Sequence, residues 1–172
     1  MVASVSSQMN DTFKHVMSRL ATPVTIATTF SDEHGPKGLT CSAFMSVSAQ
    51  PPIVAIGIHT RSSFLGTLSA SGIFAINVLH QGESDMALRF ASPDRERFTH
   101  VAWRHSAATR APLLGEGCVA HFDCNLLETM TNGDHVVAFG LVLAAIDGMS
   151  DSYPLIYCRR SFGTWAPENT ET

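Results

Sequence analysis

The dipeptide Asn132-Gly133 most constrains the fold, because it separates two segments that both have strand character. Asn-Gly is a preferred sequence of the two-residue turns that join antiparallel strands. Before it, Val119–Glu128 alternates between apolar and polar side chains, as a half-buried strand does. After it, His135–Ile146 is mostly apolar and reads as the return strand. The sequence therefore predicts a β-hairpin around residues 132–133.

Further short strands and a few helices are expected along the chain. Runs of β-branched and apolar residues between turn residues predict strands, and apolar residues spaced three and four apart predict helices. The expected strands are Val24–Phe30, Gly38–Val47, Ile53–Ile58, Ile73–Leu79 and Tyr153–Cys158; the expected helices are Ser62–Ala70, Ser84 to about Ala91, one capped by Asn10 with the apolar face Phe13, Val16, Met17 and Leu20, and one turn opening at Ser92-Pro93-Asp94. Trp103–Gly117 is expected to be irregular. Six or seven short strands with peripheral helices favour a mainly β, closed-barrel fold over a βαβ sheet.

Length and charge limit the classes of function. The 172 residues fit one domain over 1–172, with residues 1–9 and 166–172 expected to be flexible ends. A net charge of −4 argues against a general nucleic-acid binder. Only 15% of the residues are charged, below the usual ~25%, which indicates surface buried in an oligomer. No apolar run is long enough to span a membrane and no export signal is recognisable, so a cytoplasmic location is expected.

Several common sites are excluded by spacing. Cys41, Cys118, Cys124 and Cys158 form no C-x-x-C pair, so free thiols are expected. The eight histidines show no metal-ligand spacing, and no metal site is predicted. Residues 115–120 match G-x-G-x-x-A but open an alternating strand instead of a helix, which excludes a Rossmann site.

A hydroxyl-rich segment is the first candidate site. Thr40, Ser42, Ser46 and Ser48 lie at alternate or near-alternate positions, so on one strand they form a polar edge that can bind phosphate or polyol oxygens. The same pattern also fits an ordinary exposed strand face. Both interpretations stay open on periodicity alone.

Three shorter motifs are further candidates. Ser62 and Ser63, next to Arg61, open an expected helix, where unpaired N–H groups bind anions; ordinary helix capping explains them equally well. His135 sits at the expected hairpin tip, where it can donate to a phosphate or amide or simply be solvated. Arg160 and Phe162 combine a guanidinium with an aromatic ring, although a solvated basic end has the same composition.

The motifs also form an ordered series over about residues 12–165. Its members are Phe13–Met17, Val24–Thr29, Gly38–Phe44, Ser46–Ser48 with Pro51-Pro52, Ile73–Leu79, Arg89-Phe90, Phe98 with Trp103, Pro112–Leu114, Gly133–His135, Phe139–Val142, Pro154–Tyr157, and Arg160 with Phe162. Each motif is weak alone, but the series resembles the short-chain flavin reductase family, whose fold is the FMN-binding split β-barrel of Greek-key type. The resemblance implies that fold, with peripheral helices.

The resemblance also implies roles for individual residues. Flavin-binding roles fall on Thr40, Ser42, Ala43, Ser46, Val47, Ser48, Ser62, Ser63, Asn77, Arg89 and Phe90, and nicotinamide-binding roles on His135, Arg160 and Phe162. No catalytic side chain is implied, because hydride passes directly between the two cofactors. Two positions depart from the family pattern. Cys41 stands where a small, apolar or hydroxylic residue is common, and Phe162 stands where a tyrosine is common.

The implied activity is that of an NAD(P)H:flavin oxidoreductase, a homodimer that reduces FMN or FAD with NADH or NADPH. Family members commonly supply reduced flavin to a separate monooxygenase or halogenase, so such a partner is expected. One alternative is a flavin-binding protein of this fold without reductase turnover. Another is an oxidase of the pyridoxine-phosphate type, which needs a more basic phosphate site than residues 59–63 provide. The sequence shows no recognisable 2′-phosphate site, which favours NADH.

Overall fold

The computed structural model describes residues 6–93, 96–148 and 151–165, which form three helices and twelve strands. In chain order the elements are α1 (Ser7–Met17), β1 (Thr22–Pro23), β2 (Thr25–Ser31), β3 (Gly35–Cys41), β4 (Phe44–Ala49), β5 (Pro52–His59), α2 (Phe64–Ser71), β6 (Ile73–Leu79), α3 (Ser84–Ala91), β7 (Trp103–His105), β8 (Pro112–Leu114), β9 (Cys118–Asn132), β10 (His135–Asp147), β11 (Leu155–Cys158) and β12 (Ser161–Thr164). None of these three helices combines the length and apolar character that a membrane crossing requires.

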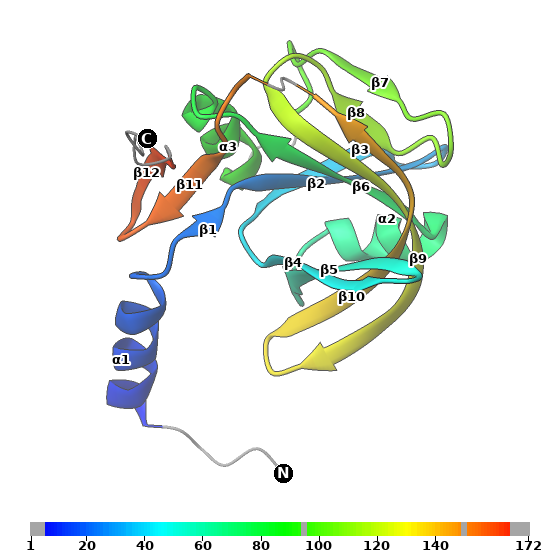
Figure 1. The fold of residues 1–172 in the computed structure, drawn as a ribbon. Coiled ribbons are helices and arrows are strands. Elements are labelled where there is room, and N and C mark those ends of the chain that lie inside the picture. Colours follow the sequence, from blue (N-terminus) through cyan, green and yellow to red (C-terminus); the bar gives the residue numbers. More distant parts are fainter. Residues whose placement is uncertain (1–5, 94–95, 149–150, 166–172) are drawn as a thin grey trace.

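Seven antiparallel strands form the body of the molecule, in the order β3-β2-β6-β9-β10-β5-β4 (Figure 1). β3 and β4 are therefore opposite edges of one sheet, yet only Ser42 and Ala43 separate them along the chain. The carbonyl of Ala43 accepts a hydrogen bond of 2.9 Å from the amide of Gly57 on β5. The sheet thus closes on itself at residues 42–43, and the predicted mainly β barrel is confirmed.

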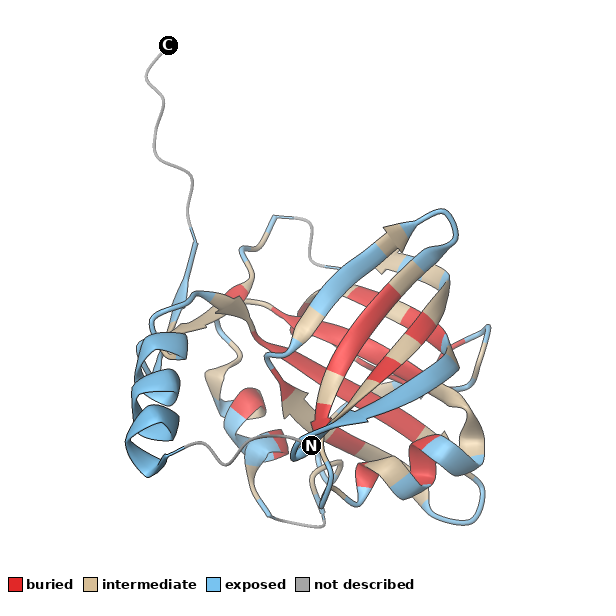
Figure 2. Cartoon of the chain, turned by 90° about the horizontal axis from the view of Figure 1, so that it is seen from below, coloured by how far each residue is buried: buried red, intermediate tan, exposed pale blue. Residues whose placement is uncertain are grey.

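Apolar side chains fill the interior of this barrel. The buried residues are coloured red in Figure 2 and lie mainly on the strands. Ile56, Phe74 and Ile76 are fully or almost fully buried there, together with Phe64 and Leu68 of α2. Burying a side chain of this size contributes about 1.5–3 kcal/mol, so the barrel interior supplies much of the stability. α2 is held to the barrel by the same contacts.

The predicted hairpin at residues 132–133 is confirmed. β9 and β10 pair from Asn132↔His135 onward, and Gly133 has a φ of 62°, the left-handed conformation that such turns require. Register shifts at Phe139/Gly140 and Val142/Ala144 interrupt the ladder. Such bulges bend a strand and increase its twist, which suits two long strands that curve around a barrel.

Several expected boundaries were wrong. The single strand over Gly38–Val47 is two strands, because the chain leaves β2 and pairs with β5 after crossing residues 42–43. Trp103–Gly117 is not irregular throughout, since β7 and β8 pair within it. β12 was not expected and pairs with β11. In each case the partner strand is distant in sequence or the segment is too short to show a period.

The N-terminal helix also differs from expectation. It begins at Ser7 instead of following Asn10, because the hydroxyl of Ser6 accepts a hydrogen bond from the amide of Met9. The flexible end predicted over residues 1–9 therefore overlaps a helix, and residues 1–5 and 166–172 lie outside the described part. α1 buries none of its residues and stands away from the barrel (Figure 2). No helical turn forms at residues 92–93, and Asp94 lies outside the described residues.

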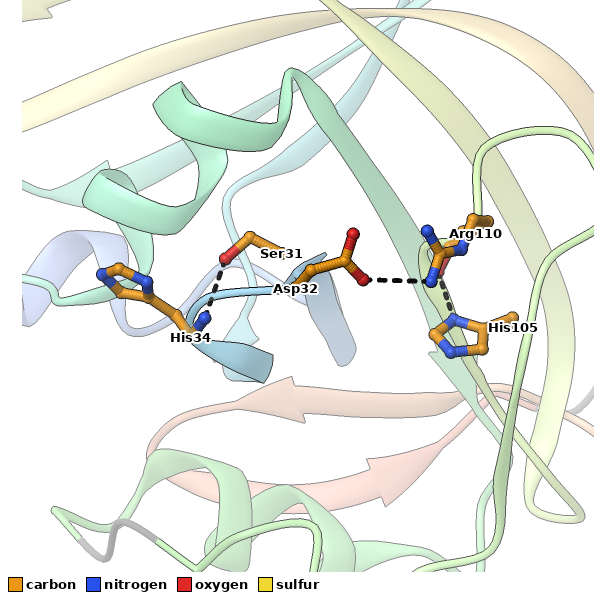
Figure 3. A network of polar contacts seen from close by, with 5 residues as sticks. All are labelled: Ser31, Asp32, His34, His105 and Arg110. Atoms are coloured by element: carbon orange, nitrogen blue, oxygen red, sulfur yellow. Dashed lines mark hydrogen bonds and ion pairs between the residues drawn. The ribbon is translucent and has the colours of Figure 1, made fainter.

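The β7–β8 hairpin is tied to the β2–β3 turn by polar contacts (Figure 3). The guanidinium of Arg110 donates to Asp32 Oδ1 at 3.2 Å and lies 5.3 Å from the ring centre of Phe30. Nδ1 of His105 lies 2.6 Å from the carbonyl of Arg110. Both Asp32 and Arg110 are exposed, so this contact orients the hairpin and adds little stability.

Candidate functional site

Three adjoining cavities form a groove where the barrel closes, which we call the barrel groove. Its central cavity, about 360 Å³, is lined by Leu39, Thr40, Cys41, Ser42, Ala43, Gly57, Ile58, His59, Ser62, Phe90, Ala91, Arg97 and His135. The end of β3, the link at residues 42–43 and the end of β5 therefore form much of its wall. Six of the lining residues are ones for which the sequence predicted a binding role.

The local structure of this link explains why residues 42–43 face the groove. Residues 42–43 belong to neither strand, and both are exposed. The adjacent Cys41 thiol is buried and donates to the carbonyls of Ala43 at 3.5 Å and Gly57 at 3.6 Å. Burial raises the pKa of this thiol, so Cys41 is a neutral hydrogen-bond donor that supports the link and is not a nucleophile.

At one end, a cavity of about 540 Å³ is basic and shares Ser62 and Arg97 with the central cavity. Its described lining contains three cations, Lys37, Arg61 and Arg97, and no carboxylate. Ser62 and Ser63 lie just before α2 and also line it, and the Ser62 hydroxyl accepts from the amide of Phe64 at 3.3 Å. Cations, a hydroxyl and a helix N-terminus together favour a phosphate group.

At the other end, a cavity of about 320 Å³ is more aromatic and shares Thr40 and Ser42 with the central cavity. Tyr157 and Phe162 face each other across the β11–β12 hairpin with ring centres 5.2 Å apart. Arg160, at the turn of the same hairpin, also lines this cavity. Rings and a guanidinium suit a planar, charged ligand.

A histidine pair stands beside the central cavity. β5 and β10 pair His59 with His135, whose rings are 5.3 Å apart. The exposed Asp134 carboxylate lies 2.7 Å from Nδ1 of His135. This hydrogen bond holds the pKa of Asp134 below its usual value, with a smaller contribution from the charge of His135. The contact orients the imidazole, and Nε2 is the ring nitrogen that it leaves available.

Nine of the fourteen predicted binding residues line the three cavities: Thr40, Ser42, Ala43, Ser62, Ser63, Phe90, His135, Arg160 and Phe162. Five do not. Ser46 and Val47 are exposed on β4, and Ser48 accepts a hydrogen bond from the amide of Gln50. Arg89 is exposed, and its guanidinium donates to the carbonyl of Thr99 at 2.9 Å.

Asn77 occupies a position that does not fit the role predicted for it. Its side chain is fully buried in β6, away from the three cavities. The amide nitrogen donates to the carbonyl of Ile26 at 3.0 Å and to Thr28 at 3.1 Å. The amide oxygen accepts from the amide of Leu114 and from Nδ1 of His121, both at 2.9 Å. Asn77 therefore joins four strands of the core, and it has no donor left for a ligand.

Lys37, Arg97 and Tyr157 line the groove with cationic or aromatic side chains, and the sequence analysis gave none of them a binding role. Arg97 lines both the basic and the central cavity and donates to the carbonyl of Gly38 at 2.6 Å. It belongs to a loop 59 residues along the chain from its partner, so no short-range spacing points to it. Tyr157 had one usable signal, since it lies in an expected strand five residues before Phe162.

Comparisons with known proteins identify the family of this chain. Residues 17–166 match the family model described as "Flavin reductase like domain". The NADH-dependent flavin reductase of Kitasatospora aureofaciens is 39% identical over 158 residues, which cover 92% of this chain and 83% of that protein. The reductase subunit HsaB of a flavin-dependent monooxygenase from Rhodococcus jostii is 34% identical, over 92% of this chain and 79% of that one.

Solved structures show the same fold. Nitrilotriacetate monooxygenase component B from Mycobacterium thermoresistibile superposes with a TM-score of 0.88 at 30% identity, covering 98% of this chain and 93% of that one. The NADH:FAD oxidoreductase SgcE6 of Streptomyces globisporus, in complex with NAD and FAD fragments, gives 0.87 at 28% identity, covering 98% and 99%. With a matching family model, relatives of similar length and a split barrel whose groove lies at its closure, this chain belongs to the flavin-reductase-like family.

Proposed function

We propose that the barrel groove is where this flavin reductase holds FMN or FAD beside NADH or NADPH. One observation carries the proposal: the groove is basic at one end, lined by hydroxyls in its middle and aromatic at the other end. That order of chemistry matches a phosphorylated polyol joined to a planar ring, with room for a second planar ring. The donors NADH and NADPH are both named among the similar reductases.

The residues present fit such a group. The phosphate of FMN is a dianion, and Lys37 and Arg61 offer it two cations. Arg97, whose guanidinium donates to the carbonyls of Gly38 and Ser92, adds positive charge to the same lining. Ser42 and Ser62 offer hydroxyls to a ribityl chain in the central cavity. The apolar walls of that cavity, which include Ile58 and Phe90, suit an isoalloxazine ring.

The chemistry divides between cofactors and protein. A bound flavin supplies a ring that accepts a hydride from a reduced nicotinamide. Phe162 and Arg160 would orient the nicotinamide dinucleotide at the aromatic end, and His135, held by Asp134, offers Nε2 as a hydrogen-bond donor or acceptor. The chain contributes position and exclusion of water, which are large terms when two rings must be aligned. No protein nucleophile is needed.

A steady-state assay of the four combinations of FMN or FAD with NADH or NADPH tests the function. Turnover with at least one pair is expected. Protein that binds flavin but turns over with neither donor would establish the alternative, a flavin-binding protein without reductase activity. As a test of the basic end, Arg61→Gln should weaken FMN binding by about fivefold, the scale of one surface charge-assisted contact. Arg104→Gln, at an exposed position of β7 outside the groove, is the matched control.

We propose a homodimer in which a second copy covers the apolar face of α1. Five apolar side chains are between 45% and 62% exposed: Met9, Phe13, Val16 and Met17 on α1, which buries none of its residues, and Leu20, three residues beyond its end. Isolated surface apolar residues are normal, but five on one face form a patch typical of an interface. The low fraction of charged residues supports the same proposal.

We further propose that the reduced flavin serves a partner monooxygenase or halogenase in the cytoplasm. Similar proteins are named as reductase components of flavin-dependent monooxygenases, and the structure of BorF is named as the flavin reductase component of a bacterial tryptophan halogenase. The four cysteines are free thiols, which suits a reducing compartment. The net charge of −4 gives no support to a nucleic-acid partner.

A further inference from the structure

A fourth cavity, about 360 Å³, is lined by residues from the C-terminal end of α1 and from the turn between β11 and β12. These two segments lie side by side in Figure 1. Its lining consists of His15, Ser18, Arg19, Arg159 and Arg160, which we call the arginine cluster. Three guanidiniums and an imidazole therefore face one small space. Within the part of the chain that the structure describes, no carboxylate pairs with any of them. Like charges gathered without a counterion favour an anionic ligand.

The backbone of the cluster is held in an unusual conformation. Arg159 and Arg160 form the two-residue turn and have φ values of 52° and 62°. Asn and Gly are the usual residues in such turns, because the left-handed conformation costs other residues about 1–2 kcal/mol each. Contacts with the α1 end hold the turn: the amide of Arg159 donates to the carbonyl of Ser18 at 2.5 Å, and the Cys158 thiol donates to that of Arg19 at 3.3 Å. Unfavourable backbone at two arginines points to a role for their side chains.

The cluster adjoins the barrel groove at its aromatic end, because Arg160 lines both cavities. The basic cavity proposed for the flavin phosphate lies at the opposite end of the groove. His15, Ser18 and Arg19 have i, i+3, i+4 spacing and so share one side of the α1 end. None of these three residues belongs to the apolar face proposed as the dimer contact.

We propose that the arginine cluster binds a phosphate group of the nicotinamide dinucleotide. Guanidiniums bind phosphate through paired hydrogen bonds, and three of them fit a group that carries one or two charges. This inference rests on the proposed function, since the dinucleotide enters at the aromatic end of the groove. The phosphate belongs either to the pyrophosphate that NADH and NADPH share or to the 2′-phosphate of NADPH. In either case, residues at the C-terminal end of α1 would help to determine the affinity for the nicotinamide donor.

Isothermal titration of ADP-ribose and of 2′-phospho-ADP-ribose tests the proposal without turnover. Arg19→Gln and Arg159→Gln are the test variants, and both keep the backbone groups that hold the turn, the carbonyl of residue 19 and the amide of residue 159. Each should raise the Kd of the recognised ligand about fivefold or more, and added salt should weaken wild-type binding more than variant binding. Arg104→Gln, exposed on β7, is the control and should leave both Kd values unchanged.

The outcomes separate the sources of the phosphate. If the two variants weaken the binding of both ligands equally, the cluster contacts the pyrophosphate. If they weaken the binding of 2′-phospho-ADP-ribose alone, it contacts the 2′-phosphate. Wild-type protein that binds neither ligand, or Kd values that stay unchanged in both variants, overturns the proposal. Turnover of wild-type protein with flavin and NADH or NADPH is measured in parallel, so that a failure of the reductase function is seen separately from a failure of the cluster.

Discussion

Gly38 on β3 is expected to resist substitution, because its neighbours leave no room for a side chain. A Cβ at this position would lie 2.6 Å from Cε1 and 2.8 Å from Cδ1 of Phe90. Favourable carbon–carbon contacts lie at about 3.5–4.0 Å, so the ring must move by about 1 Å. Phe90 is fully buried and packs against Phe98 with ring centres 5.1 Å apart. Overpacking of such a core costs about 1–3 kcal/mol, and we expect about 2 kcal/mol for Gly38→Ala.

Thermal unfolding measures this cost. For a chain of this size, 2 kcal/mol corresponds to a decrease in Tm of about 4–8 °C. Gly66→Ala is the matched control, because Gly66 lies inside α2 and a Cβ there meets no heavy atom within 4 Å. That variant should gain about 0.5–1 kcal/mol from the helix preference of alanine. Since Phe90 also lines the central cavity, Gly38→Ala should weaken FMN binding and Gly66→Ala should not.

The double variant Gly38→Ala/Phe90→Leu tests the assigned cause. Leucine lacks the ring atoms that the new methyl group meets, so the double variant should lose less stability than the sum of the two single variants. A Tm for Gly38→Ala within 1 °C of wild type, or strictly additive losses, would refute the close-contact argument. Lack of space would then not explain why glycine occupies position 38. Its backbone conformation would not explain it either, because its φ lies outside the left-handed region.

Three further predictions concern donor binding, pH and assembly. His135→Ala should raise the KM for the dinucleotide about fivefold, the scale of one lost hydrogen bond, and leave the Kd for flavin nearly unchanged. An unchanged KM would show that His135 does not contact the nicotinamide donor. Burial, followed by the charge of Arg104, lowers the pKa of His121 below 6.5, so the neutral form is favoured in the folded state. The free energy of unfolding should therefore fall as pH drops below about 6.5 in chemical denaturation, and His121→Gln should flatten that slope. Phe13→Glu should convert the proposed dimer to a monomer in light scattering, and a dimer mass unchanged from wild type would exclude α1 from the interface.

Much of the secondary structure could be predicted from local sequence. Ile73–Leu79 and Ser84–Ala91 have the predicted bounds, and the hairpin at residues 132–133 formed as expected. These segments carry strong local signals: a continuous apolar run, a helical period and an Asn-Gly turn. The candidate site was also partly readable, since its hydroxyls and the Arg160–Phe162 pair are concentrated in short motifs. The motif series likewise pointed to the family.

The tertiary structure determined which of those motifs meet. Periodicity made Gly38–Val47 one polar edge, but the chain crosses between opposite sheet edges at residues 42–43, so Ser42 faces the groove while Ser46 lies on exposed β4. Asn77 lies in the core, where its side chain is hydrogen-bonded to four buried partners from other strands.

The sequence likewise did not predict the positions of Arg97 and the arginine cluster, because the residues around them come from remote segments of the chain. Local sequence therefore carries the elements and the chemical groups that can bind a cofactor. Barrel closure is a long-range event, and only the closed barrel decides which of those groups share a cavity.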